Sequence, residues 1–182
     1  MKKFILTLLT VAGLATEVYA QERIIGGTSV DISQRPYMAE IFGRKVNDPY
    51  MHLGGGAILN ERWILTAAHV VDDIDINLSE VSTGNNNPSK DNNRSSIEAI
   101  YIHPNYIYTE ENIENDVALI KLSEPLVFGT NRQAIKLSQI TQYPDNTVAT
   151  ISGWGRTSLE SQSHPTMYRL QMLLLTPILT SI

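Results

Sequence analysis

Two polar residues lie where acid–base chemistry could be done. His69 follows an apolar run that ends in Thr-Ala-Ala, and Asp116 opens the run Val-Ala-Leu-Ile. A histidine, with a pKa of about 6.5, can take up and return a proton around neutral pH. A carboxylate at the head of a buried strand is costly unless it is hydrogen-bonded, and orienting an imidazole repays that cost. Taken singly, a histidine is more often structural and a strand-end aspartate more often solvated, so their surroundings must decide.

Composition limits the chemistry further. The chain has no cysteine, which excludes a cysteine nucleophile and a zinc–thiolate site. The net charge of −5 argues against nucleic-acid or anionic-membrane binding, since both need basic patches. The other histidines lack a comparable setting and are expected to be structural; they are His52, His103 and His164. An acidic stretch could form a calcium loop, but such loops are usually only solvated, so no metal and no cofactor is expected; its members are Asp72, Asp73, Asp75 and Glu80.

The N-terminus carries the pattern of a secretory signal peptide. Two lysines precede an apolar stretch over residues 4–14, and residues 18–20 place small side chains at the −3 and −1 positions of a cleavage site. The stretch is shorter than the roughly 18 apolar residues that span a bilayer. We therefore predict that residues 1–20 are removed as a signal peptide. The mature protein is then expected to be secreted or periplasmic, without a membrane anchor.

A short leader, residues 21–23, would then precede the bond between Arg23 and Ile24. An Arg–Ile bond in such a leader is a plausible cut site for another protease. Cutting it would expose an apolar N-terminus followed by two glycines. By itself the pattern is weak, because Arg–Ile pairs are common and Gly-Gly usually marks only a turn.

The elements that must position these residues are predicted to be strands. Short apolar runs recur between clusters of Gly, Asn, Pro and Asp, and no apolar stripe of helical period persists. Residues 84–93, rich in asparagine, are expected to be an exposed loop. This spacing predicts an all-β sandwich or barrel. The candidate strands span residues 37–42, 55–59, 63–67, 97–102, 117–122 and 148–152, with a last one near 167–175.

Four segments resemble the trypsin/chymotrypsin-like serine protease family, peptidase S1. They are Ile-Ile-Gly-Gly at 24–27, residues 55–69 ending in Thr-Ala-Ala-His, Asn-Asp-Val-Ala-Leu-Ile-Lys-Leu at 115–122, and Ile-Ser-Gly-Trp-Gly at 151–155. The resemblance implies a double antiparallel β-barrel in which His69 is the general base and Asp116 orients it. It also implies a protein or peptide substrate, and activation by a protease that cuts after Arg23 and frees the amino group of Ile24.

The sequence departs from the family at the nucleophile. No Gly-Asp-Ser-Gly-Gly segment is present, and Ser181 has no glycine turn around it. In the family that segment also supplies the oxyanion hole, so the resemblance implies that this chain alone is inactive. The positions of a family disulfide are taken by Gly54 and Val70, which fits a fold without that bridge.

The expected architecture is a trypsin-like domain over residues 24–182 that is truncated before the nucleophile. Residues 24 to about 137 would supply nearly all of the first barrel. Residues 147–182 would only begin the second barrel and leave the apolar side chains of residues 172–175 uncovered. The main hypothesis is a secreted serine endopeptidase precursor with a truncated sequence. Two alternatives stay open: a non-catalytic binding protein, and a half-enzyme completed by a second chain.

Overall fold

The computed structural model describes residues 28–45, 51–140, 143–144, 147, 149–154 and 171–175. For residues 28–29, 51 and 171–175 it describes the backbone only. The predicted signal peptide, the Arg23–Ile24 bond, His164 and Ser181 lie outside these ranges and stay predictions. None of the helices within them reaches the length and apolarity that crossing a bilayer requires.

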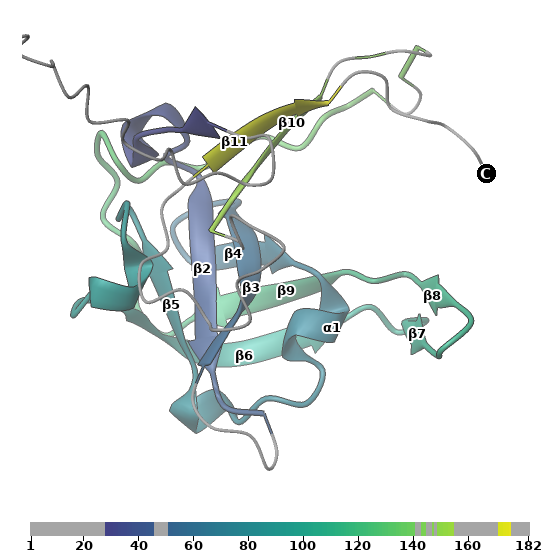
Figure 1. Cartoon of the computed structure of the whole chain (residues 1–182). Helices are drawn as coiled ribbons and strands as arrows, with labels where there is room; N and C mark the ends of the chain where they lie inside the picture. Colours follow the sequence, from purple (N-terminus) through teal and green to yellow (C-terminus); the bar gives the residue numbers. More distant parts are fainter. Residues whose placement is uncertain are drawn as a thin grey trace, which may run out of the picture.

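Six antiparallel strands close into a barrel in the order β2-β3-β4-β9-β6-β5 (Figure 1). Closure pairs every strand on both sides, so the barrel has no open edge that could pair with another chain. This confirms the predicted all-β fold, and the strands predicted between residues 37 and 122 all fall in the barrel. The barrel strands are β2 (Met38–Gly43), β3 (Met51–Ile58), β4 (Trp63–Thr66), β5 (Glu80–Thr83), β6 (Ser95–Ile102) and β9 (Ala118–Leu122).

The barrel interior is filled by side chains that alternate along the strands. In β9 every second residue is buried, which places Ala118, Ile120 and Leu122 inside. Gly56 on β3 makes room for this packing, because a Cβ there would lie 2.8 Å from Ile64 Cγ2 and 2.9 Å from the Leu65 carbonyl oxygen. The core is completed by further apolar residues from the other strands and from the segments between them: Ala39, Ile41, Ile58, Ile64, Ala68, Val70, Val71, Val81, Ile97 and Leu126.

Strand β5 is not predicted by the sequence, because Glu-Val-Ser-Thr contains a single apolar side chain. Ser82 and Thr83 are nevertheless buried, and Ser82 Oγ donates a hydrogen bond of 2.6 Å to Asp91 Oδ2. Asp91 belongs to residues 84–93, and the prediction that this segment is an exposed loop is wrong in part. Pro88 is fully buried at the start of the 3-10 turn η3 (Pro88–Lys90).

The cause of that burial is Arg94. Its guanidinium donates to the Pro88 carbonyl oxygen at 2.9 Å and lies 3.8 Å from the centroid of the Phe42 ring. A cation over an aromatic face is attracted by the ring, and the same group satisfies a backbone acceptor. Arg94 therefore draws the segment onto the outer wall of the barrel, a long-range contact that asparagine content alone does not reveal.

A single helical turn, α1 (Ala68–Val71), follows β4 and packs on β3. A Cβ placed on Gly54 would lie 2.8 Å from Val70 Cγ2, so the valine side chain occupies the space above the glycine. These are the two positions at which the family resemblance implies a disulfide. Here a glycine and a buried valine pack directly instead.

A second, smaller sheet contains β1 (Thr28–Ser29), β11 (Gln171–Leu175) and β10 (Ala149–Gly153), in that order. Strands β10 and β11 pair antiparallel from Ala149↔Leu175 to Gly153↔Gln171, the hairpin pairing expected of residues 147–182. Trp154, at the end of β10, is 3% exposed and packs with Ile32 and Met38. The predicted exposure of the 172–175 side chains lies outside what the structure describes.

Candidate active site

The barrel topology brings His69 and Asp116 together. Strands β4 and β9 pair antiparallel, with Thr66 opposite Ala118. The chain therefore leaves β4 and enters β9 at the same end of the barrel. His69 lies just beyond that end on α1, and Asp116 lies just before it, so two residues far apart in sequence become neighbours (Figure 1).

The carboxylate of Asp116 holds both the ring and the backbone of His69. Asp116 Oδ2 lies 2.7 Å from His69 Nδ1, and Asp116 Oδ1 accepts the His69 backbone N–H at 2.9 Å. The His69 side chain is 51% exposed. With Nδ1 engaged by the carboxylate, Nε2 is the nitrogen available to exchange a proton with a bound molecule.

The electrostatics favour an ionised Asp116. Burial alone would raise its pKa, but hydrogen bonds from the backbone and ring of His69 and from the backbone of Ala68 outweigh it and hold the pKa below its ordinary value. An ionised carboxylate is an acceptor only, so His69 Nδ1 must carry the proton. The arrangement thus selects one imidazole tautomer, the one whose Nε2 is a base.

The turn before Asp116 has an unusual backbone. Asn115 has a φ of 51°, in the left-handed region that asparagine tolerates better than most residues. Its side-chain Nδ2 donates to the Asn105 carbonyl oxygen at 2.9 Å, and its own carbonyl accepts the Val117 N–H at 2.7 Å. The turn is therefore fixed from two sides, which determines where the Asp116 carboxylate points.

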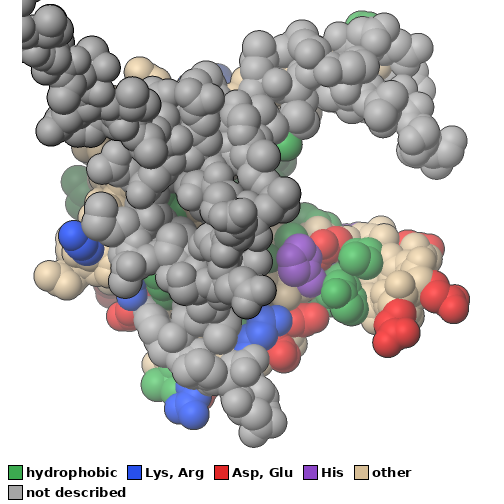
Figure 2. All heavy atoms as spheres, viewed as in Figure 1, with side chains coloured by type: hydrophobic (Ala, Val, Ile, Leu, Met, Phe, Trp, Pro, Cys, Tyr) green, Lys and Arg blue, Asp and Glu red, His purple; other side chains and the backbone are tan. Residues whose placement is uncertain are grey.

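A two-stranded hairpin, β7 (Ile107–Tyr108) and β8 (Ile113–Glu114), projects from the barrel just before Asn115. Ile107, Tyr108 and Ile113 are about half exposed or more on it. In the space-filling view a histidine side chain lies open beside the apolar and acidic side chains of this projection (Figure 2). The sequence does not predict this hairpin, whose strands are only two residues long.

The structural interpretation of His52 and His103 agrees with their surroundings. His52 on β3 contacts the carboxylate of Glu40, a β2 side chain that is 1% exposed. His103 Nδ1 accepts the backbone N–H of Asn105 at 3.2 Å, a local turn contact. Neither is brought to the His69–Asp116 pair.

The acidic residues considered for calcium have other partners. Asp72 and Asp73 pair with Lys45, at 3.3 and 2.7 Å, and Glu80 lies 3.6 Å from Arg94. Asp75 caps the 3-10 turn η2 (Ile76–Leu78) by accepting the Asn77 N–H. Over the residues whose positions are described, no group of three or more His, Asp or Glu side chains is placed to hold a metal ion.

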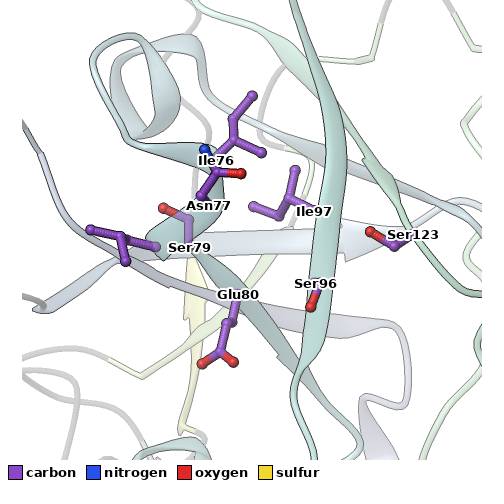
Figure 3. Close-up of a pocket in the computed structure, with 8 residues that line it drawn as sticks. Ile76, Asn77, Ser79, Glu80, Ser96, Ile97 and Ser123 are labelled. Carbon is purple, nitrogen blue, oxygen red and sulfur yellow. The ribbon is translucent and has the colours of Figure 1, made fainter.

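A hollow of about 510 Å³ lies away from His69 and Asp116, at η2 and β6 (Figure 3). Its walls are largely polar and include neither residue of the pair. The lining residues are Ile76, Asn77, Leu78, Ser79, Glu80, Ser96, Ile97 and Ser123. The exposed His69–Asp116 pair therefore stays the candidate active site.

Sequence reasoning missed one residue that touches His69. Lys45 Nζ donates to the His69 carbonyl oxygen at 3.1 Å. Nothing in the sequence around Lys45 marks it, because the contact depends on how the end of β2 lies against α1.

Comparison with known proteins agrees with the fold and with the motifs. The family model for trypsin matches residues 24–177. A trypsin of Simulium vittatum is 34% identical over 136 residues, covering 74% of this chain and 54% of the relative. Complement C1s subcomponent of Bos taurus is 33% identical over 164 residues, 84% of this chain and 23% of the relative. Trypsin-2 of Salmo salar is 33% identical over 147 residues, 80% of this chain and 58% of the relative.

The chain spans about half the length of the two trypsins, at 54% and 58%, and less of the complement protein, at 23%. The family match covers both barrel strands that position His69 and Asp116, together with β10 and β11 of the second sheet. The chain belongs to the trypsin family of serine proteases.

Proposed function

We propose that this chain contributes the general base and its orienting carboxylate to a secreted trypsin-like endopeptidase. The observation that carries the proposal is the 2.7 Å contact between His69 Nδ1 and Asp116 Oδ2, with the His69 ring half exposed. In this role His69 Nε2 takes the proton of an attacking serine hydroxyl and returns it to the leaving amine. Asp116 stabilises the imidazolium that forms in between.

In this proposal the serine comes from outside residues 1–182, because these contain no Gly-Asp-Ser-Gly-Gly segment. We propose that a further C-terminal portion, or a second chain, supplies the serine and the backbone donors of the oxyanion hole. Removing the serine alone costs about a million-fold in rate in an enzyme of related mechanism, which is about 8 kcal/mol of barrier. The 182-residue chain by itself is accordingly expected to be inactive toward peptide esters and toward fluorophosphonate probes.

Activation and export follow from the N-terminal pattern. Residues 1–20 would direct export and then be removed. A protease that cuts after Arg23 would free the Ile24 amino group to pair with a carboxylate of the completed second barrel. The trypsin family match begins at residue 24, which supports this boundary. The exposed apolar residues of the β7–β8 hairpin, which ends two residues before Asp116, support a peptide chain as substrate.

The proposal is tested with an extended protein. The chain is extended beyond Ile182 with the C-terminal portion of a full-length relative, and hydrolysis of peptide anilides is measured before and after cutting at Arg23. Activity is expected only after the cut, and His69→Ala should lower kcat by about 10⁴-fold or more. His103→Gln changes a ring that accepts a local turn N–H, from Asn105, and keeps the backbone hydrogen bonds to Val117 and Tyr106; it is the matched control and should leave kcat unchanged.

A completed chain that folds, is cut at Arg23 and shows no serine protease activity would contradict the proposal. A binding protein without catalytic activity would then be the better interpretation. Labelling of any serine in the unextended chain by a fluorophosphonate would contradict the claim that the nucleophile lies elsewhere.

A further inference from the structure

Lys45 lies at the end of the barrel, where an isolated bridge pairs it with Ile74. Its ammonium donates to the His69 carbonyl oxygen at 3.1 Å and contacts Asp72 Oδ1 at 3.3 Å and Asp73 Oδ1 at 2.7 Å. An ammonium has three protons to donate, and three acceptors surround this one. Burial would lower the pKa of Lys45, but the hydrogen bonds that it donates to Asp73 and Asp72 outweigh burial and raise the pKa, so the group stays charged.

These contacts lie at the C-terminal side of α1. A helix of four residues leaves its carbonyl groups without helical partners, and a cation near the C-terminal end is favourable for that reason. The His69 backbone is consequently held at both of its polar groups. Asp116 accepts its N–H at 2.9 Å, and Lys45 donates to its C=O at 3.1 Å.

Asp72 extends this arrangement to another segment of the chain. Its second oxygen, Oδ2, accepts a hydrogen bond of 3.2 Å from the Tyr106 hydroxyl. The Tyr106 ring packs against the barrel core, and its N–H donates to the His103 carbonyl at 2.9 Å. Burial, followed by the charge of Asp72, raises the pKa of Tyr106 to about 12, so the hydroxyl stays a donor.

We propose that Lys45 and Tyr106, joined through Asp72, are positioning residues for His69. They belong to two different segments of the chain and fix the turn so that the imidazole stays against Asp116. Neither contact involves the ring, since Lys45 acts on the backbone carbonyl and Tyr106 acts on Asp72. The proposal rests on the proposed function only in that His69 is taken as the catalytic base. A displacement of such a group by about 1 Å can cost a hundredfold in rate.

Amide hydrogen exchange tests this proposal directly, because it reports how often the His69 N–H leaves the Asp116 carboxylate.

The experiment measures amide hydrogen exchange by NMR in the full chain, with the variants Lys45→Met and Tyr106→Phe. Both are expected to speed exchange at the His69 N–H by about tenfold, the loss of one charge-assisted hydrogen bond. Exchange at Ile41 and Ile120, inside the barrel, should not change. Lys45→Arg, which keeps the charge and the donors, should restore slow exchange.

Lys121→Met is the matched control, because it breaks a lysine–glutamate ion pair of 2.6 Å on the barrel wall that involves neither α1 nor Asp116. It should leave His69 exchange unchanged. The proposal is overturned if both test variants leave His69 exchange at the wild-type rate, or if they speed His69, Ile41 and Ile120 equally, as general destabilisation would. If Lys45→Met does not fold, Tyr106→Phe, which removes one oxygen atom, decides alone.

A second readout uses the completed enzyme. There the same variants should lower kcat by about tenfold and leave KM nearly unchanged, because they act on the base and not on substrate contacts. If the extended chain is inactive, the proposed function is contradicted, but the exchange result at His69 still stands. Changed exchange at His69 with an unchanged kcat would overturn the positioning role itself.

Discussion

The barrel is a closed sheet, whereas the three-stranded sheet is open. Every barrel strand has two hydrogen-bonded neighbours, and Ile120 at its centre is fully buried. In the second sheet, as far as it is described, β10 pairs with β11 alone and Ile151 on β10 is 48% exposed. Both residues are isoleucines on antiparallel strands, so the difference comes from closure and not from composition.

The comparison shows which region positions the proposed base. Strands β4 and β9, which bring His69 to Asp116, both belong to the closed barrel. The geometry of the pair therefore depends on the closed barrel. In the proposed function, the nucleophile and the oxyanion hole belong with the second sheet.

The largest expected effect comes from matched truncations in the two regions. Ile120→Ala should lower the free energy of unfolding by about 2–5 kcal/mol, because it leaves a cavity in a packed core. Ile151→Ala should change it by less than about 0.5 kcal/mol, since the side chain is half exposed. Urea unfolding of the full chain, followed by circular dichroism, measures both. Equal losses would mean that the sheet is packed as well as the barrel.

A disulfide between positions 54 and 70 should raise the stability of the folded chain by an effect confined to the barrel, because both positions lie there and not in the second sheet. A Cβ on Gly54 would lie 3.6 Å from Val70 Cβ, inside the range of about 3.5–4.5 Å found in disulfides. The double variant Gly54→Cys, Val70→Cys should stabilise the chain by about 3 kcal/mol when oxidised, the value for a loop of about 15 residues. Thermal unfolding with and without reductant measures the gain.

The single variant Gly54→Cys is the control for that design. With valine still at position 70, the new Cβ would lie 2.8 Å from Val70 Cγ2, so the single change should destabilise the chain. A stable single variant, or an oxidised double variant no more stable than the reduced one, would show that α1 does not pack on β3 as described.

The smallest expected effect concerns Glu40 on the outer wall of the barrel. Burial raises the pKa of Glu40 well above its ordinary value. A carboxyl with a raised pKa in the folded state contributes stability that is full below its unfolded pKa of about 4.3 and is lost as the pH rises through the folded value. Glu40→Gln does not titrate, so the difference between its Tm and the wild-type Tm should increase as the pH rises above about 4.3, the unfolded pKa.

Thermal unfolding across that pH range measures the slope. Glu98→Gln, at a side chain that is 44% exposed, is the matched control. The opposite slope would mean that Glu40 is ionised and paired with a charged His52, its contact on β3. The sign of the slope therefore shows whether the buried contact between Glu40 and His52 stabilises the folded barrel or destabilises it.

Sequence patterns predicted most of the barrel but not the parts built from polar residues. Apolar alternation marks β4 and β9 clearly, and both lie within a residue of the predicted bounds. It fails at β5, whose buried Ser82 needs Asp91 as a partner, and at Pro88, which Arg94 holds against the wall. In each case a polar group is buried because a distant residue satisfies it, and no local pattern records that.

By itself the sequence determined the all-β fold, the family, and His69 and Asp116 as candidates, because motifs and alternation are local properties. The tertiary structure decided that the two residues meet at 2.7 Å and that Asp116 also holds the His69 backbone. It alone linked Lys45 and Tyr106 to α1 through the His69 carbonyl and Asp72. The physical reason is that these contacts join segments brought together only when the barrel closes, and hydrogen bonds depend on distance and angle, not on separation along the chain.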